Sequence, residues 1–429
     1  MNNNNLRNEF WLIPFFVEIC YTPVESEGKN MYYKKPKLLY YRFLQFIAWF
    51  VATFIFKRKF VRNEIKGKKG PFVVIANHEA SLDFVNLIGA TKTRMSFVVS
   101  SSFFNTLPVK GFMQKIGVIP KSQFQTSLKD LKQMKSVIDA NAPIAIYPAG
   151  LMCEDGLSTP IPPATYKFLK MLDADVYVAR TVGTYFVMPK WTKGFRPGRT
   201  YMDIYKLFSK EELKSIDLET IQKKTDEALL FDAYREQEQH LIKYKKNHII
   251  NGLEDVLYMC PHCLSEFSMK VRDNNTIVCE NCGFEQESDE YAFMHNHKGI
   301  GPKLRYVSDW SKLIYENLKE KIKTGKEAVL SASTRIQMIS LKDKKFVDVG
   351  QGCITLSPDS FFIDGNINGD VVQMHIPIGS FISLPFKPGK YLEIQQGDDI
   401  YRCVLDDGKL AMKFINMIKI FYELKKGSQ

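Results

Sequence analysis

Cysteine is scarce in this sequence, and neither an internal repeat nor a secretory signal is evident. Eight cysteines in 429 residues are too few for a disulfide-stapled scaffold. A content of 45% apolar residues excludes a disordered chain, and the length allows two or three domains. The opening MNNNNLRNEF lacks the basic region with which a signal peptide begins. We therefore expect the bulk of the chain to stay in the cytoplasm.

Acidic residues are nearly missing from Met31 to Lys69. This stretch contains eleven Lys and Arg residues and one acid, Glu64, so it carries +10 of the total net charge of +12. The basic residues flank Leu38 to Phe56, LLYYRFLQFIAWFVATFIF. Basic flanks around an apolar, aromatic segment indicate a membrane surface that contains anionic lipids.

This apolar segment is barely long enough to span a bilayer. As a helix it would rise about 28 Å, against roughly 30 Å for the hydrocarbon core. Arg42 and Gln45 shorten the clean apolar run to Phe46 to Phe56. A short span, a re-entrant helix and an interfacial helix stay open, and the shallow placements are favoured among them. A buried core helix is the alternative, but such a helix rarely has large apolar residues all round with Lys at both ends. We predict that residues 1–69 associate with the cytoplasmic face of the cell membrane, peripherally or by shallow insertion.

From about Gly70 to Asp203, short β-branched runs alternate with amphipathic stretches, which predicts an α/β domain with a buried sheet. A charged helical extension follows, with Ser209 at its start, and the predicted domain covers residues 70–250. The expected strands are Phe72–Ala76, Met95–Ser100, Ile144–Tyr147 and Val176–Ala179, and Ser127–Asn141 is an expected helix.

Four cysteines form the pattern C-x2-C-x15-C-x2-C: Cys260, Cys263, Cys279 and Cys282. This spacing predicts a zinc ribbon at residues 255–292, and with four thiolate ligands no position is left open for catalysis, so the Zn²⁺ is structural. His262, His295 and His297 are expected to be spectators. Because the ribbon is locally acidic, a nucleic-acid partner is disfavoured, and we interpret the ribbon as a folding or docking element.

The last part of the chain, residues 300–429, has the pattern of a mostly-β domain. An amphipathic helix, Leu410 to Lys425, follows a series of short runs that we predict as strands separated by turn residues. These runs are FVDV, CITLS, SFFIDG, VVQMHIP, YLEIQQ and YRCVLDDG. Six or seven strands closed by a terminal helix resemble a pleckstrin-homology or GRAM-like barrel. That resemblance rests on topology alone.

His78 and Asp83 directly follow an apolar strand. In one continuous helix, residues five apart would lie about 140° from each other. They meet only if His78 lies in a turn before a helix that starts near Ser81, so that Asp83 folds back. Asp83 would then fix the tautomer of His78, leaving the other ring nitrogen to take a proton from an alcohol.

The order of the neighbouring motifs resembles the glycerolipid acyltransferases, best known from the bacterial 1-acylglycerol-3-phosphate acyltransferases. Asn77-His78-x4-Asp83 resembles their first motif, and Asn105-Thr-Leu-Pro108-Val-Lys-Gly111-x5-Gly117-Val-Ile-Pro-Lys121 their second. Tyr147-Pro148-Ala149-Gly150 stands where the family has Phe-Pro-Glu-Gly, and Val187-Met188-Pro189 resembles the fourth motif. The resemblance covers about Gly70 to Gly198.

The resemblance implies transfer of a fatty acyl group from a CoA or acyl carrier protein thioester to the hydroxyl of a lysophospholipid. His78 would be the general base and Asp83 its orienting partner. Lys121 would help to hold the acceptor phosphate, although an ordinary solvent-exposed lysine is an equal alternative. Asn77, Ser81, Gly150 and Glu154 complete the expected substrate-binding residues.

The third motif departs from the family pattern. Ala149, Leu151 and Met152 replace the usual Glu, Thr and Arg. Glu154 and Asp155 follow downstream, either as candidate replacements for the lost carboxylate or as solvated residues of a turn that ends at Gly156. The acceptor is 1-acyl-sn-glycerol-3-phosphate by default, with another lysolipid or an amino-acid-containing lipid as rival. The alternative function is an inactive acyltransferase-like zinc-ribbon protein with a regulatory, lipid-binding or nucleic-acid-binding role.

Overall fold

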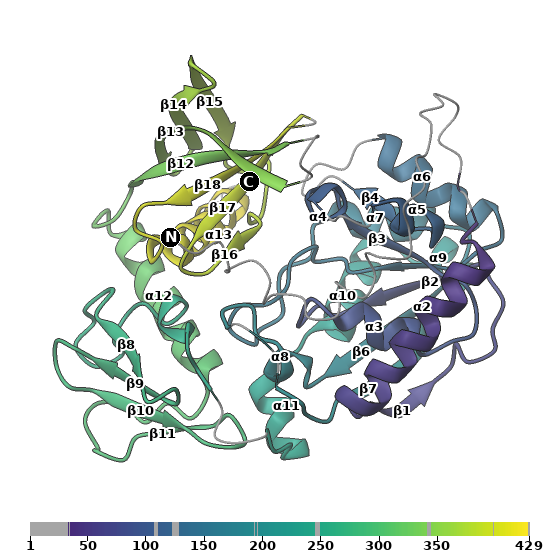
Figure 1. The fold of residues 1–429 in the computed structure, drawn as a ribbon, viewed down its shortest axis with the longest axis horizontal. Helices are drawn as coiled ribbons and strands as arrows, with labels where there is room; N and C mark the ends of the chain where they lie inside the picture. Colours follow the sequence, from purple (N-terminus) through teal and green to yellow (C-terminus); the bar gives the residue numbers. More distant parts are fainter. Residues whose placement is uncertain are drawn as a thin grey trace. The chain divides into compact units, whose positions relative to one another are not determined.

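The structure is a computed structural model that describes residues 33, 35–106, 110–121, 128–192, 194, 196–244, 249–340, 345–397 and 399–427 (Figure 1). Pro108 of the second motif and Ser127 of the expected helix lie outside the described residues. The chain divides into two compact units. Unit 1 takes in the described residues of Met1–Cys153, Ser158–Met188 and Lys193–Phe231, and unit 2 takes in Glu154–Leu157, Pro189–Thr192 and those of Asp232–Gln429.

In the described part of unit 1, seven strands form one mixed sheet, which confirms the predicted α/β alternation. β6 and β7 are antiparallel, and all other neighbours are parallel. The carboxyl ends of β6, β2, β5, β3 and β4 therefore meet at one edge. The spatial order is β1 (Lys59–Asn63), β7 (Tyr201–Phe208), β6 (Asp175–Val182), β2 (Phe72–Ala76), β5 (Ile144–Ile146), β3 (Ser96–Ser100) and β4 (Ile119–Lys121).

The core of unit 1 lies against the central strands. All five residues of β2 are buried, as expected for a strand that is covered on both faces. Val73, Ile75 and Val176 pack into one cluster with residues from four helices. These helices are α6 (Leu128–Asp139), α7 (Ala164–Met171), α9 (Lys210–Ser215) and α10 (Leu218–Leu229). The Ser209 hydroxyl caps α9 by accepting the Glu212 N–H, which confirms the predicted start of the helical extension.

The apolar N-terminal segment forms α2 (Leu38–Phe50), continued by a π-helical turn η1 (Val51–Ile55). α2 packs on α3 (Asp83–Ile88) and α5 (Lys110–Lys115). Its inner face is held by polar contacts as well: the Tyr41 hydroxyl accepts the Met95 N–H at 2.9 Å, and the Gln45 amide donates to the Thr91 carbonyl at 2.7 Å. Two further short helices are α4 (Ser101–Thr106) and α8 (Thr184–Val187).

The outer face of this helix is also apolar. Leu38–Ile55 is long and apolar enough to cross a membrane by length and composition, and 28% of it is buried. The exposed side chains follow helical spacing, so they form one stripe. The large apolar side chains among them are Leu38, Leu39, Phe43, Phe46, Trp49, Phe50 and Phe54.

The described part of unit 2 contains two antiparallel sheets. The smaller one is β11 (Met294–His295), β10 (Glu285–Ser288), β9 (Thr276–Cys279) and β8 (Met269–Arg272), preceded by α11 (Ala233–His240) and the short helix η2 (Leu253–Asp255). The larger one is β15 (Asp370–Pro377), β14 (Ser360–Ile367), β13 (Lys345–Leu356), β12 (Leu330–Ser340), β18 (Asp399–Leu405), β17 (Tyr391–Gln396) and β16 (Phe386–Lys387). The additional β-rich region is thus present, and its likeness to a pleckstrin-homology or GRAM barrel stays a prediction.

The terminal helix α13 (Leu410–Gly427) is buried nearly all round from Ala411 to Phe421, rather than on one face only, and residues 422–426 are half-buried or exposed. Phe414 packs edge-on against Phe361 of the larger sheet. α13 also contacts α12 (Val307–Lys323), and Lys413 donates to Glu266 of the cysteine-containing region at 2.6 Å. The ribbon region and the β-rich region therefore belong to one compact unit, and separate boundaries for them stay a prediction.

Candidate active site

His78 and Asp83 lie together at the carboxyl edge of the sheet. β2 ends at Ala76, and α3 begins at Asp83, so His78 occupies the turn between them. The Asp83 side chain folds back, and its Oδ2 lies 3.0 Å from His78 Nδ1. The geometry is the expected one, and the helix starts near Ser81, although its N-cap residue is Leu82. The helix begins at Asp83, and the Ser81 hydroxyl donates instead to the Met188 sulfur at 2.9 Å.

Backbone donors fix the Asp83 carboxylate. The same oxygen accepts the N–H groups of Glu79 and Ala80 at 2.7 and 2.9 Å, and the side chain is 1% exposed. Because this oxygen is the hydrogen-bond acceptor for both backbone N–H groups, it is also the acceptor in its contact with Nδ1 of His78. Nδ1 therefore carries the proton in neutral His78, which leaves Nε2 as the acceptor nitrogen.

Tyr147, the first residue of the third motif, covers the imidazole. The ring centroids of His78 and Tyr147 are 4.6 Å apart, with a tilt of 36°. Burial, and to a lesser degree the Asp83 charge, raise the pKa of Tyr147 well above its usual value. Tyr147 is therefore a neutral side chain that restricts the orientation of His78, whose own side chain is 21% exposed.

Asn77 fastens the end of β2 to β6. Its amide donates to the Thr181 carbonyl at 2.7 Å, and its carbonyl accepts the Thr181 N–H at 2.8 Å. The side chain is buried. The structure thus gives Asn77 a part in holding the first motif, and the predicted contact with substrate stays a prediction.

Glu79 is a residue of the first motif that the sequence did not single out. It is fully buried, and its Oε2 accepts the Thr184 hydroxyl at 2.9 Å and the Tyr185 N–H at 3.0 Å. These contacts fasten the His78 turn to α8 of the fourth motif. No sequence signal identifies it, because a single Glu between His and Asp looks the same as a surface acid.

The third motif forms a turn beside His78. The Gly150 N–H donates to the Tyr147 carbonyl at 3.0 Å, and Gly150 is exposed with a φ of +68°, a conformation that favours glycine. Farther along, the Cys153 N–H donates to the His78 carbonyl at 3.2 Å. The first, third and fourth motifs therefore meet around the same turn.

Lys121 of the second motif lies at the same edge of the sheet. Lys121 of β4 lies opposite Ser100 of β3 in the strand pairing. The registers of the intervening strands place both residues level with Asn77, which follows β2. β4 is three strands from β2, which corresponds to roughly 14 Å. Burial lowers the pKa of Lys121, and Asp130 partly offsets this effect. The motif also requires Gly117, because its φ is +77° and a Cβ there would lie 2.6 Å from Pro36.

Glu154 is not grouped with His78 in unit 1. It belongs to unit 2, where its carboxylate lies 2.5 Å from Lys419 Nζ and 3.9 Å from Lys190 Nζ. Its predicted contact with substrate stays a prediction, and its partners include these two lysines.

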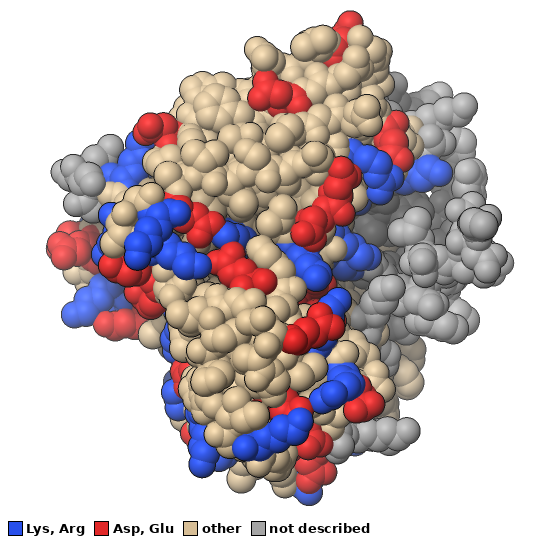
Figure 2. All heavy atoms as spheres, turned by 90° about the vertical axis from the view of Figure 1, so that its left-hand side faces the viewer, with Lys and Arg blue, Asp and Glu red and all other residues tan. Residues whose placement is uncertain are grey.

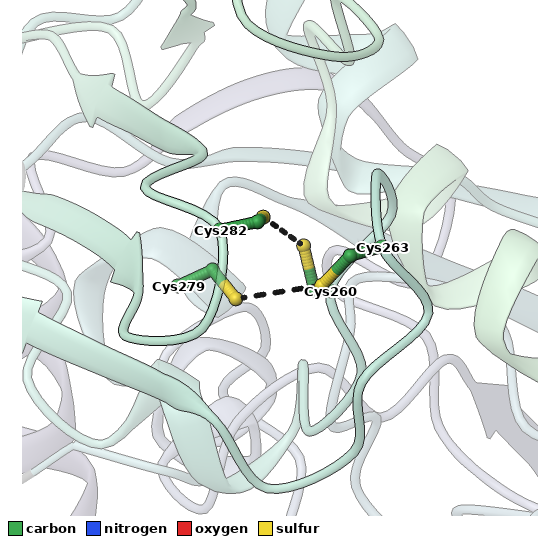
Figure 3. A group of neighbouring side chains, drawn as sticks. All are labelled: Cys260, Cys263, Cys279 and Cys282. Carbon is green, nitrogen blue, oxygen red and sulfur yellow. Dashed lines mark hydrogen bonds between the residues drawn. The ribbon is translucent and has the colours of Figure 1, made fainter.

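The four predicted zinc ligands converge on one point (Figure 3). Their sulfur atoms lie within 4.8 Å of one another, with Cys260 to Cys282 at 3.7 Å and Cys263 to Cys279 at 3.8 Å. A regular tetrahedron with Zn–S bonds of about 2.3 Å has sulfur atoms about 3.8 Å apart. The donor set and its dimensions therefore fit Zn²⁺. Nε2 of His295 lies 2.7 Å from Oδ2 of Asp289.

The ribbon surface carries charges of both signs. In the lower half of Figure 2, which views the ribbon from outside, basic and acidic side chains are interspersed. Arg272 and Lys298 both pair with Glu285, and Lys243 pairs with Glu290. A nucleic-acid interface normally has a continuous basic face, and the visible face of the ribbon has none.

Comparison with known proteins agrees with the motif order. The sequence model of the Acyltransferase family matches residues 36–187, which include the N-terminal helix and all four motifs up to Val187. No curated protein matches the chain. Among solved structures, the 1-acyl-sn-glycerophosphate (LPA) acyltransferase PlsC from Thermotoga maritima matches with 16% identity and a TM-score of 0.39, over 44% of this chain and 76% of that chain. The chain therefore contains an Acyltransferase family domain at residues 36–187, which supports an acyltransferase enzyme.

Proposed function

We propose that this enzyme transfers a fatty acyl group from a CoA or acyl carrier protein thioester to the hydroxyl of a lysophospholipid. The observation that carries the proposal is the His78–Asp83 contact, in which one carboxylate oxygen serves three N–H groups. An imidazole fixed in this way is suited to remove a proton from an alcohol. The preferred acceptor is 1-acyl-sn-glycerol-3-phosphate.

The reaction needs no nucleophile from the protein. Nε2 of His78 takes the proton of the acceptor hydroxyl while the oxygen attacks the thioester carbonyl. The tetrahedral intermediate then expels the thiolate, and the imidazolium returns the proton to the leaving sulfur. Asp83 stabilises the imidazolium throughout, and Tyr147 keeps the ring in place.

Residues at the same edge of the sheet as His78 bind the acceptor. Lys121 supplies a cation level with Asn77, which suits the phosphate of a lysophospholipid. Gly150 and Ser81 lie on the two loops beside His78 and complete the acceptor site. Ala149 and Met152 stand where the family has a carboxylate and an arginine. They leave room for a different headgroup, so several classes of acceptor should be tested.

The lipid substrate is reached through the exposed face of α2. One face of this helix is packed on unit 1, and the other presents an aromatic stripe next to a basic segment. An apolar face of this kind inserts at the boundary of headgroups and acyl chains, and basic flanks favour anionic lipids. The enzyme thus lies on the cytoplasmic face of the membrane, peripherally or shallowly inserted.

The cysteine cluster has a structural role in this proposal. Cys260, Cys263, Cys279 and Cys282 hold one Zn²⁺, and four thiolates leave no ligand position for a substrate. When bound, the metal cross-links two turns of the ribbon, and the reaction itself proceeds through His78 alone.

The function is tested by identifying the product. Purified enzyme in detergent is given labelled acyl-CoA or acyl carrier protein thioester together with a panel of lysolipids of different headgroups. We expect a diacyl lipid to form with at least one acceptor, most rapidly with 1-acyl-sn-glycerol-3-phosphate. Transfer to water alone, or no transfer from either donor to any acceptor, contradicts the proposal.

A further inference from the structure

Two short segments leave unit 1 beside the His78 turn and belong to unit 2. They are Glu154–Leu157 and Pro189–Thr192, here called the two straps. The residue before each strap contacts the turn within unit 1. The Cys153 N–H donates to the His78 carbonyl at 3.2 Å, and the Met188 sulfur accepts the Ser81 hydroxyl at 2.9 Å. Each strap is joined by one peptide bond to a residue that contacts the His78 turn. Contacts that hold a strap in place therefore also restrict that residue.

One carboxylate joins both straps to the terminal helix. Glu154 of the first strap lies 2.5 Å from Nζ of Lys419 on α13 and 3.9 Å from Nζ of Lys190 in the second strap. The three side chains are 4%, 18% and 6% exposed. Little water is available to replace a lost partner, so this ion triad differs from an ordinary surface pair.

Further contacts fasten each strap inside unit 2. In the first strap, Asp155 accepts the Ser311 hydroxyl of α12 at 2.5 Å, and the Gly156 carbonyl accepts the Ala233 N–H at 2.8 Å. In the second strap, Lys190 lies over the Phe386 ring at 3.6 Å. Trp191 is buried, and its carbonyl is so close to Gly252 that a Cβ there would lie 2.3 Å away.

The charges of the triad are mutually dependent. Burial by itself raises the pKa of Glu154, but Lys419 and Lys190 outweigh it and bring the pKa below its usual value. The carboxylate thus stays ionised because of the two lysines. Removing Lys419 takes the nearest cation, at 2.5 Å, away from a buried carboxylate, and the first strap then gains by moving the carboxylate toward water.

We propose that Lys419, acting through Glu154, is a positioning residue for acyl transfer. It fixes the two straps whose neighbours, Cys153 and Met188, hold the His78 turn. This inference rests on the proposed role of His78 as general base, and it assigns Glu154 to positioning in place of substrate contact.

The helix offers a matched control. Lys413, six residues earlier on α13, is also buried and pairs with Glu266 and Glu327. Neither partner belongs to a strap. Replacing Lys413 disturbs the same helix and the same unit but leaves the triad intact, so it separates a loss of positioning from a general loss of stability.

The kinetic test compares Lys419→Met, Lys419→Arg and Lys413→Met in the full chain at equal zinc content, below the melting temperature of each variant. We expect Lys419→Met to lower kcat at least tenfold, with KM for donor and acceptor changed less than threefold. Lys419→Arg should recover kcat to within threefold of wild type, and Lys413→Met should stay within that range. An unchanged kcat in Lys419→Met, or an equal loss in Lys413→Met, overturns the proposal. Should Lys419→Met not fold, Glu154→Gln takes its place with the same limits.

A second readout is independent of the reaction. Amide hydrogen exchange should accelerate at least tenfold in Lys419→Met within 151–157 and 188–192, with no change in the ribbon, and Lys413→Met should not show this pattern. Unchanged exchange in the straps overturns the positioning role. If wild type transfers no acyl group, the proposed function fails, whereas an active wild type with unaffected Lys419→Met contradicts the positioning role alone.

Discussion

Asp83 determines what His78 can do, because its Oδ2 is the acceptor for two backbone N–H groups and the imidazole at once. An asparagine at this position presents one carbonyl and one amide group. If the carbonyl keeps the backbone donors, the imidazole loses part of its orienting contact, and the amide cannot stabilise an imidazolium.

Asp83→Asn should therefore lower kcat by about 10² to 10⁴, with residual transfer by a misoriented His78. The measurement is the initial rate at saturating donor and acceptor. Asp139→Asn, which alters an exposed partner of Lys135, serves as the control and should match wild type. An Asp83→Asn rate within threefold of wild type would contradict the assigned role of Asp83.

Lys121→Ala should weaken acceptor binding. A charge-assisted contact to a phosphate contributes about 1.5 to 3 kcal/mol, so KM for a phosphate-bearing lysolipid should rise at least tenfold, with KM for the thioester unchanged. Lys135→Ala, which removes an exposed lysine of the same unit, is the matched control. Equal KM values for Lys121→Ala and wild type would show that Lys121 does not contact the acceptor.

For individual residues, the sequence predicted the pairing of His78 with Asp83, because residues five apart can meet only where the first lies in a turn before the helix of the second. It did not predict the partners of Asn77 or Glu79. Thr181 and Thr184 follow about one hundred residues later, so their proximity is set by the β2–β6 pairing and not by local pattern. Ser81 was a candidate start of the helix because a hydroxyl is a common cap, but the N-cap residue is Leu82 and makes no side-chain cap hydrogen bond. Asp83 accepts the N–H groups of Glu79 and Ala80, which precede the helix.

Among the elements, α2 has two apolar faces with different partners. Phe46 and Trp49 lie on the exposed face. Replacing both with serine should reduce binding to vesicles with anionic lipids at least tenfold, because the burial of two aromatic side chains is lost. Binding is measured by sedimentation with the vesicles. The control in this assay is Met171→Ser, at an exposed apolar residue of α7. Undiminished binding of the double variant would exclude this face from the membrane contact.

The sequence identified most of the elements but misjudged two features of the strands. The runs FVDV and CITLS, predicted as two strands, are one strand, β13. Gly350 and Gly352 separate these runs and look like turn residues. They are required because a Cβ at either position would collide with the β14 backbone, at 1.7 Å from the Asn366 carbonyl and 2.3 Å from that of Asp364. β1 lies within the segment that was assigned to the membrane-associating region.

For the whole molecule, we expect one zinc per chain and a stability that depends on it. Structural zinc binding contributes about 10 to 16 kcal/mol in small domains, so a chelator should lower the melting temperature by ten degrees or more. The paired Cys260→Ser and Cys279→Ser variant should contain no zinc, and Cys353→Ser, outside the cluster, should retain it. Metal-free protein with intact, reduced thiols and an unchanged melting temperature would contradict the zinc site.

The order of domains was readable from the sequence, but the membership of the straps was not. Composition changes over tens of residues reveal an α/β region, a cysteine ribbon and a β-rich region. Segments of four residues, such as Glu154–Leu157, are too short to show such a change. Their membership of unit 2 follows from contacts with α12 and α13, which lie more than 150 residues farther along the chain.

The central claim is that His78 is the base in acyl transfer, and the most direct measurement is the rate of diacyl lipid formation by His78→Ala. The control is His297→Ala, at an exposed histidine, with both variants matched to wild type in zinc content and melting temperature. We predict that His78→Ala loses at least 10³-fold in rate while His297→Ala retains full activity. Transfer by His78→Ala at the wild-type rate would contradict the account.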